Sequence, residues 1–465
     1  MGGWCEEKCE RILVKGFTNL EAKDSAVVNR NSKHIVVVGG GYVGLYTVLR
    51  LQHTLRRELR DGSVRITVLT PESHMTYQPF LPEAAAGNLS PRHVVVPLRR
   101  VLSKATILNG KVSKVNHAAK TVTFAPNVGT PHEIGYDIMV MAAGSISRTL
   151  PIPGLADAAI GFKTVGEAIA LRNRVLELLD RAESDDDEAL RRRALTFVVV
   201  GGGFAGIEAL AELEDMAVDA TRYYRNISRE DMRWILVEAT DRILPEVGPE
   251  MGAWTAEQLR ERGIEVKMNT RLDSCEGGLV KLSDGDEFES ATIVWTAGVK
   301  PSPVVNAGDL PLDERGRIKT TARLTVVGVK DAYSAGDVAG VPDLTNPGQY
   351  CAPNAQHAVR QAKVLADNIT RSLRGQKLVD YRHRYVGSVA GLGLHKGVAN
   401  VYGIKLRGIA AWFMHRTYHL SRVPTVNRKV RVTADWTLAL FFKRETVSLG
   451  EIEKPRTEFR AAASN

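Results

Sequence analysis

The sequence predicts an α/β fold with two similar parallel-sheet units and a basic, amphipathic C-terminal segment. Two observations carry this prediction. A glycine-rich turn between an apolar run and an amphipathic run occurs twice, and the excess positive charge is confined to residues 381–465. The 465 residues are enough for about three domains. With 44% apolar and 25% charged residues, the composition excludes a disordered, collagenous or coiled-coil chain.

The first glycine-rich turn follows the β-branched run 34–38 and reads G-x-G-x-x-G, with an amphipathic helical pattern after it. A strand before the motif and a helix after it are the context that a dinucleotide-binding turn requires. We expect Gly39 to make the tight turn, Gly41 to let the backbone approach a pyrophosphate and Gly44 to let helix and strand pack closely. The helix N-terminus then offers N–H groups to the phosphates.

The second turn, Gly201-x-Gly203-x-x-Gly206, has the same strand and helix context, 162 residues after the first. One such motif is weak evidence, but two at this separation favour two Rossmann-like dinucleotide sites in one chain. A flavin site and a pyridine-nucleotide site would form a relay that accepts hydride from one ligand and passes it to another.

The charge of the chain is uneven. The whole chain carries +9, whereas residues 381–465 hold 15 Lys and Arg against 5 Asp and Glu. This segment also contains clustered aromatic residues, namely Trp412, Phe413, Trp436, Phe441 and Phe442. Basic charge with apolar clusters favours an anionic membrane surface, because no nucleic-acid-binding signature accompanies it. The longest apolar runs, such as 409–414, have about six residues, and a membrane-spanning helix needs about 18.

Four cysteines do not make a disulfide framework, and the N-terminus has no apolar export signal, so we expect an intracellular protein. Cys5 and Cys9 lie in an N-terminal extension to which we assign no function. The pairs Cys5/Cys9 and His415/His419 have i, i+4 spacing without further ligands nearby, so no metal site is expected.

The chain resembles the two-dinucleotide-binding flavoproteins. Three segments carry the resemblance beside the two turns: residues 136–145, 291–299 and 331–337. The resemblance implies an FAD-binding domain (33–155 and 312–375) with an inserted NADH-binding domain (156–311). Residues 1–32 are then an N-terminal extension, and 376–465 are a C-terminal region for quinone and membrane association.

Within these flavoproteins, the chain is most similar to the type II NADH:quinone oxidoreductases. The marks are the runs 77–87, 355–361 and 385–393 and the basic, tryptophan-bearing tail. Disulfide-reducing members need a cysteine pair shortly after the first βαβ unit, and no cysteine lies between Cys9 and Cys275. The resemblance implies an FAD enzyme that passes two electrons from NADH to a membrane quinone. Menaquinone and ubiquinone are not distinguished.

The resemblance also implies an assembly and a location. We expect a homodimer that binds anionic lipid peripherally, on the cytoplasmic side of the cell membrane. Because the sequence contains no transmembrane charge pathway, we expect no proton pumping.

The residues assigned to sites fall into two sets. On the acceptor side, the resemblance places Gln356 and Gln361 at the quinone and Glu208 near flavin and quinone, where it positions nicotinamide or supplies protons. The expected cofactor-binding residues are Gly39, Gly41, Gly44, Glu72, Gly144, Gly336, Asp337, Gly201, Gly203, Gly206, Glu238 and Gly298.

Three of these carboxylates have specific expectations. Glu238 ends a strand 37 residues after Gly201, where a carboxylate accepts hydrogen bonds from ribose hydroxyls and repels a 2′-phosphate. The matching strand of the flavin half ends in Thr70, so Glu72 or a backbone group is expected to bind that ribose. Glu208 is expected to be the second residue of its helix, close to the positive end of the helix dipole.

Two other classes of function fit part of the pattern. A soluble NADH-dependent reductase of a small redox protein, similar to ferredoxin reductases, needs no basic amphipathic tail. A non-enzymatic flavin sensor would show negligible turnover with quinone. A sulfide:quinone reductase, a closer relative, needs paired cysteines near the flavin, which Cys275 and Cys351 do not supply.

Overall fold

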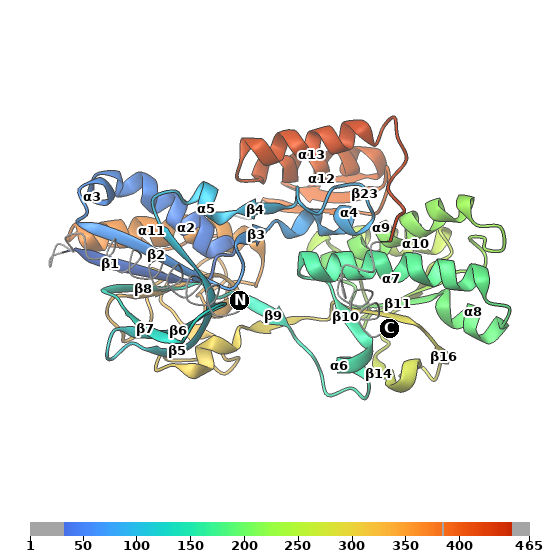
Figure 1. The fold of residues 1–465 in the computed structure, drawn as a ribbon, viewed down its shortest axis with the longest axis horizontal. Helices are drawn as coiled ribbons and strands as arrows, with labels where there is room; N and C mark the ends of the chain where they lie inside the picture. Colours follow the sequence, from blue (N-terminus) through green and yellow to red (C-terminus); the bar gives the residue numbers. More distant parts are fainter. Residues whose placement is uncertain (1–31, 384–385, 449–465) are drawn as a thin grey trace, which may run out of the picture. The chain divides into compact units, whose positions relative to one another are not determined.

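The computed structural model describes residues 32–383 and 386–448 (Figure 1). These residues form two compact units, each assembled from separate stretches of the chain. The first unit contains 32–73, Leu98–Gly144 and Pro303–Arg382. The second contains His74–Pro97, Ser145–Ser302 and the described part of 383–448.

The first unit is built on a seven-stranded sheet with the order β20-β8-β1-β2-β5-β6-β7. The strands from β20 to β5 pair in parallel, and β5, β6 and β7 form an antiparallel meander. The parallel strands are rich in Val and Ile and largely buried, as expected for strands covered on both faces. The strands of the unit are β1 (Lys33–Val38), β2 (Val64–Thr70), β5 (Thr106–Asn116), β6 (Thr121–Pro126), β7 (His132–Gly135), β8 (Ile138–Met141), β19 (Ile318–Lys319), β20 (Ala332–Ser334) and β21 (Ala339–Gly340).

The helices of the first unit pack beside its glycine-rich turn. Helix α2 connects β1 to β2, and α11 packs against α2 (Figure 1). Asn354 caps α11 by accepting a hydrogen bond from the backbone N–H of His357 at 2.8 Å. The helices are α2 (Tyr42–Thr54), α3 (Arg56–Arg60), α5 (Leu98–Val101), α11 (Ala355–Leu373) and the 3₁₀ turns η5 (Pro303–Ala307) and η6 (Gly336–Val338).

The second unit contains a five-stranded parallel sheet with the order β10-β17-β11-β12-β13. Helix α9 connects β11 to β12, repeating the β1-α2-β2 arrangement of the first unit. The elements of this part are β9 (Ser145–Ser147), α6 (Leu155–Ala158), β10 (Ala159–Gly161), α7 (Val165–Ser184), α8 (Glu188–Ala194), β11 (Thr196–Val200), α9 (Phe204–Ala220), η2 (Thr221–Tyr223), β12 (Arg233–Val237), η3 (Pro245–Val247), α10 (Pro249–Glu261), β13 (Glu265–Lys267), β14 (Leu272–Ser274), η4 (Glu276–Gly278), β15 (Leu279–Leu282), β16 (Glu287–Glu289), β17 (Thr292–Trp295) and β18 (Val299–Pro301).

Two further stretches of chain belong to the second unit. Residues 74–97 supply β3 (His74–Thr76), η1 (Gln78–Phe80), α4 (Leu81–Ala85) and β4 (Val95–Pro97). The C-terminal stretch supplies the antiparallel sheet β22 (Gly387–Gly391), β23 (Gly397–Val401), β24 (Ile404–Arg407) and the helices α12 (Gly408–Arg422) and α13 (Val426–Leu438). Helix α4 packs against α7 and α9, and α12 packs against β22 and β23. None of the helices among the described residues is long and apolar enough to cross a membrane.

The α/β fold with two Rossmann-like units is confirmed. The compact units differ in extent from the functional domains expected from the sequence. Residues 74–97 pack with the second unit although they lie inside the expected segment 33–155, and the C-terminal stretch packs with the second unit as well. The N-terminal extension, with Cys5 and Cys9, lies outside the described residues apart from Ser32.

Candidate functional site

The first glycine-rich turn joins β1 to α2. The absence of a side chain has a different consequence at each of its three motif glycines. Gly39 has φ of +110°, and a Cβ at this position would overlap the carbonyl oxygen of Ala142. A Cβ on Gly44 would overlap the carbonyl oxygen of Gly39, so glycine lets α2 approach the turn. A Cβ on Gly41, the N-cap of α2, would meet nothing within 4 Å. The turn therefore presents open backbone at a helix N-terminus, which is the arrangement that binds a pyrophosphate.

The late motif of the first unit packs against the same helix. Gly336 has φ of +73°, and a Cβ there would lie 2.6 Å from Cγ2 of Val43, the second residue of α2. The Oε1 atom of Gln361 accepts a hydrogen bond from the Gly336 N–H at 2.7 Å. Asp337, the next residue, is partly exposed. The structure thus brings Gly336, Asp337 and Gln361 together beside the first turn.

The two glutamines expected at the quinone differ in their surroundings. Gln361 is buried, and its side-chain carbonyl fixes the Gly336 backbone. Gln356 is partly exposed in the first turn of α11. The resemblance placed both side chains at the quinone, but α11 turns Gln361 into the core. Only Gln356 has the exposure that direct contact with a ligand requires.

The second glycine-rich turn, between β11 and α9, repeats the geometry of the first. Gly201 has φ of +115°, and a Cβ on Gly206 would overlap the carbonyl oxygen of Gly201. A Cβ on Gly203, the N-cap of α9, would meet nothing within 4 Å. Because the same three positions show the same three properties, the second unit offers a second dinucleotide-binding turn.

The carboxylate of Glu238 lies directly at this turn. Its Oε2 atom accepts a hydrogen bond from the Gly202 N–H at 2.6 Å. Its Oε1 atom accepts from the N–H and the hydroxyl of Thr240, both at 2.8 Å. The side chain is thus oriented at the end of β12, where a carboxylate can accept hydrogen bonds from ribose hydroxyls.

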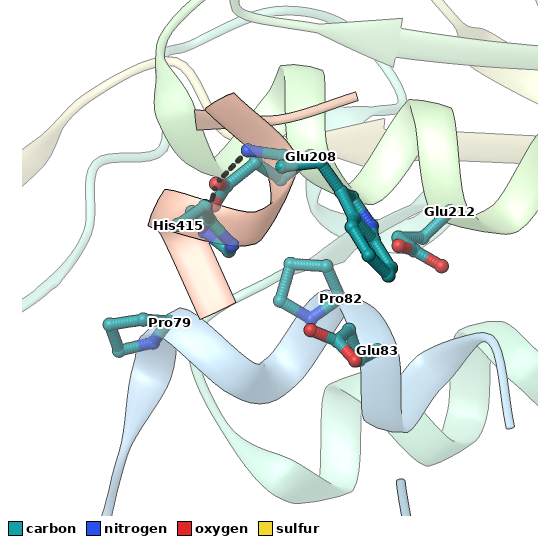
Figure 2. Close-up of a pocket in the computed structure, with 8 residues that line it drawn as sticks. Pro79, Pro82, Glu83, Glu208, Glu212 and His415 are labelled. Atoms are coloured by element: carbon teal, nitrogen blue, oxygen red, sulfur yellow. Dashed lines mark hydrogen bonds and ion pairs between the residues drawn. The ribbon is translucent and has the colours of Figure 1, made fainter. Parts of the chain in front are cut away.

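Glu208 lies deeper in α9 than expected. The helix begins at Phe204, so Glu208 is its fifth residue rather than its second, and the expectation of close contact with the helix dipole is wrong. The start was predicted too late, because Phe204, Ala205 and Gly206 are already helical and α9 begins directly after Gly203. Glu208 is buried, and its Oε1 atom accepts a hydrogen bond from the Gly391 N–H at 2.9 Å and lies 3.0 Å from Nε2 of His415 (Figure 2).

The remaining expected positions lie at strand ends. Gly144 follows β8 with φ of +65°, and Gly298 follows β17 with φ of +90°. Both are left-handed conformations that glycine adopts without strain. Thr70 ends β2 and is buried, with its hydroxyl 2.8 Å from the place of a Cβ on Gly40. Glu72 is exposed two residues further on.

Two cysteines lie in the described residues, and both are buried and free. Burial raises the pKa of the Cys275 thiol. Burial, with a smaller contribution from Asp343, raises the pKa of Cys351 to about 11. Cys275 belongs to the second unit and Cys351 to the first. Neither has the lowered pKa that makes a thiol reactive in dithiol chemistry.

Comparison with known families agrees with this geometry. Residues 33–362 match the family model for pyridine nucleotide-disulphide oxidoreductase. A type II NADH:quinone oxidoreductase of Staphylococcus haemolyticus is 31% identical over 83% of this chain and 94% of the relative. The chain belongs to the type II NADH:quinone oxidoreductases. The Ndh enzyme of Mycobacterium tuberculosis, also of this type, is 28% identical over 88% of each chain.

Solved structures agree with the fold. The structure of NDH2 from Plasmodium falciparum in complex with NADH superposes with a TM-score of 0.83, at 17% identity, over 90% of this chain and 100% of that one. The sulfide:quinone oxidoreductase of Aquifex aeolicus superposes with a TM-score of 0.66, at 18% identity, over 89% of this chain and 96% of that one. These likenesses show a shared fold.

As a type II NADH:quinone oxidoreductase, the chain uses FAD and NADH and does not pump protons. The residues present fit two dinucleotides. Each unit has an open glycine turn at a helix N-terminus, at Gly41 and Gly203, and a carboxylate stands beside the second turn. The predictions of the cofactors and of the enzyme class are confirmed, and the assignment of individual residues to them stays a prediction.

The structure reveals a cluster of residues that the sequence did not identify. Glu83, in α4, is buried, and its Oε2 atom accepts hydrogen bonds from Arg416 at 3.0 Å and from Nε1 of Trp436 at 2.6 Å. The Arg416 guanidinium also lies 4.1 Å from the ring centroid of Trp412. Glu83 stands inside the motif 77–87, but its partners follow more than 300 residues later. No local pattern could have paired them.

Proposed function

We propose that the first unit binds FAD and the second binds NADH, with the chain passing two electrons from NADH to a membrane quinone. The single observation that carries this assignment is the paired geometry of the two glycine turns, each with open backbone at its N-cap glycine. When bound, FAD supplies the two-electron chemistry, accepting hydride and giving electrons to the quinone. The protein contributes binding, orientation and the supply of protons.

On the donor side, Glu238 sets the choice of nucleotide. Its carboxylate, fixed by Gly202 and Thr240, accepts hydrogen bonds from the adenosine ribose hydroxyls. A 2′-phosphate at the same place would meet a negative charge and would remove one hydroxyl donor. The enzyme therefore uses NADH in preference to NADPH.

In the first unit, Gly336 and Asp337 hold the flavin near the first turn. Gln361 acts through them, because its buried amide fixes the Gly336 backbone and is not itself exposed to a ligand. Gln356 contacts the quinone. Thr70 stands at the end of β2, where an acidic residue was expected to bind the flavin ribose, and it packs against the first glycine-rich turn. Glu72 or a backbone group therefore binds this ribose instead.

On the acceptor side, the second unit contributes Glu208. Its buried carboxylate is held by the Gly391 N–H and lies beside His415, so it can hold or release a proton without exchanging freely with bulk water. Quinone reduction consumes protons as well as electrons, and a buried carboxylate near the acceptor is suited to deliver them.

Membrane attachment is assigned to α12, α13 and the chain that follows them. Phe413, Phe441 and Phe442 are 64%, 79% and 67% exposed. The spacing i, i+4 puts Ile409 and Phe413 on one face of α12. Exposed cations lie among them at Arg422, Arg431 and Lys443. Apolar side chains that enter the headgroup region, with cations that meet anionic lipid, bind a membrane peripherally.

Trp412 and Trp436 do not take part in this surface in the way the sequence suggested. Both are partly buried, and both pack on Arg416, at ring-centroid distances of 4.1 and 4.9 Å. They hold α12 and α13 together, which leaves the phenylalanines as the exposed aromatic residues. The expected homodimer and the cytoplasmic side stay predictions, and sedimentation velocity of the detergent-free protein tests the first.

The acceptor role of Gln356 is tested by the two half-reactions measured separately. Anaerobic stopped-flow with the Gln356→Ala enzyme should show flavin reduction by NADH close to the wild-type rate and slower reoxidation by a water-soluble quinone. The matched control is Gln376→Ala, which lies after α11 and is exposed. If both half-reactions of Gln356→Ala slow equally, the residue acts on flavin placement instead.

The membrane surface is tested with liposomes. The Phe413→Ser/Phe441→Ser/Phe442→Ser variant should lose binding to vesicles that contain anionic lipid at low salt, while its flavin is still reduced by NADH. Val128→Ser, another exposed apolar residue at 90% exposure, is the control. If the wild-type protein does not bind such vesicles, the attachment proposal fails and the soluble reductase becomes the better description.

A further inference from the structure

A small cavity with several titratable side chains in its wall lies inside the second unit, where α4, α9, β22 and α12 meet. The space open to the centre of a water molecule is about 10 Å³, enough for about one water. The side chains and backbone around it that bear on the argument are Glu83, Glu208, Glu212, Gly391, Trp412 and His415 (Figure 2). Three carboxylates and one imidazole around a space for a single water form an unusual concentration of titratable groups for a protein interior.

The closest pair in the cavity is Glu208 and His415. Nε2 of His415 lies 3.0 Å from Oε1 of Glu208, and both side chains are buried. The same Glu208 oxygen accepts the hydrogen bond from the Gly391 N–H, so the carboxylate cannot turn away easily. A buried carboxylate and a buried imidazole at this distance share one proton more readily than either exchanges it with bulk water.

The groups that face His415 favour its protonated form. Burial alone lowers the pKa of His415, but the close contact and charge of Glu208, with a smaller contribution from the charge of Glu83, raise this pKa above the usual value despite the opposing charge of Arg416. On the same helix, His419 makes an edge-on ring contact with His415 at 4.6 Å, and burial together with His415 lowers the pKa of His419 well below its usual value. The cluster thus favours the charged form of His415 and the neutral form of His419.

Glu212, one turn after Glu208 on α9, is the second proton holder. It is 5% exposed, and its Oε2 atom accepts a hydrogen bond from Nδ2 of Asn88 at 2.9 Å. Burial and the nearby charge of Glu83 raise the pKa of Glu212 to about 7, against the opposing charge of Arg444. A carboxyl poised near neutral pH can both hold a proton and give it up.

Neither a metal site nor a purely structural ion pair explains the whole cluster. Among the described residues, no group of three or more His, Cys, Asp or Glu side chains is placed to hold a metal ion. A purely structural ion pair accounts for Glu83, which Arg416 and Trp436 bind directly. It does not account for Glu212, whose nearest cation in the described structure is Arg444 at 3.9 Å. Burying a poorly paired carboxylate costs stability, so its retention calls for a use.

We propose that His415 and Glu212 are the proton store that supplies Glu208 during quinone reduction. The proposal rests on the proposed place of Glu208 at the acceptor side. His415 and Glu212 act through Glu208, so they are positioning residues rather than catalytic ones.

Quinone becomes quinol by taking two electrons and two protons, and NADH brings two electrons and one proton as hydride. The second proton starts on Nε2 of His415. This N–H bond breaks as an O–H bond forms on Glu208, and that O–H bond breaks in turn as the quinol O–H forms. Glu212 then gives its proton through the cavity water to Nε2 of His415, and Glu212 takes a proton from solvent before the next turnover.

The first test observes the proton store without turnover. In protein labelled with ¹⁵N-histidine, the ring signals of His415, assigned by their loss in His415→Gln, should titrate above the usual pKa of histidine. In Glu208→Gln the pKa of His415 should fall, because the negative charge 3.0 Å from Nε2 is removed. A neutral His415 in the wild-type protein at pH 6, or no change in Glu208→Gln, overturns the proposal.

The second test follows flavin reoxidation by a water-soluble quinone as a function of pH and in heavy water. His415→Gln should slow reoxidation about a hundredfold at neutral pH and remove its decrease at rising pH. Glu212→Gln should slow it less and reduce the solvent isotope effect. Gly391→Ala keeps the side chains of His415 and Glu212 and puts a methyl group 3.5 Å from Cε1 of His415, which is an ordinary contact distance. The methyl group should displace the water, so this variant should behave like Glu212→Gln. His53→Gln, exposed on α2, is the control.

The outcomes distinguish failure of the proposed function, of the role of Glu208 and of the proton store. If the wild-type enzyme is not reoxidised by quinone, the proposed function fails. If it is reoxidised and Glu208→Gln is unaffected, the role of Glu208 fails. If Glu208→Gln is slow but His415→Gln keeps the wild-type rate, pH profile and isotope effect, the proton store fails alone. Millimolar imidazole should partly rescue His415→Ala, which a merely structural role for His415 would not allow.

Discussion

The choice between NADH and NADPH depends on one side chain, and the substitution Glu238→Gln isolates its charge. In the structure, three hydrogen bonds orient the carboxylate: one from Gly202 at 2.6 Å and two from Thr240 at 2.8 Å. Glutamine has nearly the same shape, but its amide nitrogen cannot accept, so either the hydrogen bond from Gly202 or those from Thr240 are lost with the charge. What is lost is the negative charge and one acceptor for the ribose hydroxyls.

The expected size follows from the hydrogen bonds to a charged group. Such bonds contribute about 1.5–3 kcal/mol, and about 1.4 kcal/mol is tenfold in a rate ratio. Glu238→Gln should therefore lower kcat/KM for NADH about tenfold. It should raise kcat/KM for NADPH, because the repulsion of the 2′-phosphate is gone. The ratio of the two values should move by more than about tenfold toward NADPH.

The assay is steady-state reduction of a water-soluble quinone at fixed ionic strength with each nucleotide in turn. Glu257→Gln is the matched control, since Glu257 is exposed on α10 of the same unit. A wild-type enzyme that already prefers NADPH would refute the reasoning. So would a Glu238→Gln enzyme with an unchanged ratio, because the carboxylate would then have no contact with the nucleotide.

Three further predictions concern stability and flavin retention. Gly44→Ala should unfold the first unit or prevent flavin binding, because the methyl group overlaps the Gly39 carbonyl, whereas Gly41→Ala should fold normally and lose flavin on gel filtration. Glu83→Gln should destabilise α12 and α13 by about 3 kcal/mol and speed hydrogen exchange there, because it removes the charge that pairs with Arg416; unchanged exchange would contradict it. Burial and the charge of Arg65 lower the pKa of His34 from 6.5 to about 4, so the folded protein binds this proton less tightly than the unfolded chain. The stability that the neutral imidazole contributes is present above pH 6.5 and is lost as the pH falls toward 4. Urea unfolding should show this loss as a decrease of about 3 kcal/mol in the free energy of unfolding, and His34→Gln should not show it.

The two dinucleotide turns could be predicted because their information is local. The requirement for glycine at Gly39, Gly44 and Gly206 comes from backbone conformation and from overlaps within a few residues or with a neighbouring strand. Strand type follows from the β-branched runs, and the alternation of strands and helices predicts parallel sheets. The position of Glu238 at the turn also follows from strand order, since β12 is the direct neighbour of β11.

The cavity around Glu208 and His415 could not be predicted, because the residues that line it come from four separate stretches of chain. His415 was recognised only as half of a pair with His419, Glu83 only as a member of the motif 77–87, and Glu212 in no pattern. Likewise, the sequence placed Trp412 and Trp436 with the exposed aromatic residues. Their inward orientation depends on Arg416, which lies between both rings and the buried Glu83. The start of α9 was also predicted inexactly. The helix begins three residues earlier than expected, so the surroundings of Glu208 differ from those predicted.

The measurement that tests the account most directly is anaerobic stopped-flow of the purified protein with its two substrates in sequence. The protein should purify yellow with non-covalently bound FAD. One equivalent of NADH should bleach the flavin absorbance, and a water-soluble quinone added afterwards should restore it fully. A flavin that NADH does not bleach, or a reduced flavin that quinone does not reoxidise, would contradict the assignment of two dinucleotide sites acting as one relay.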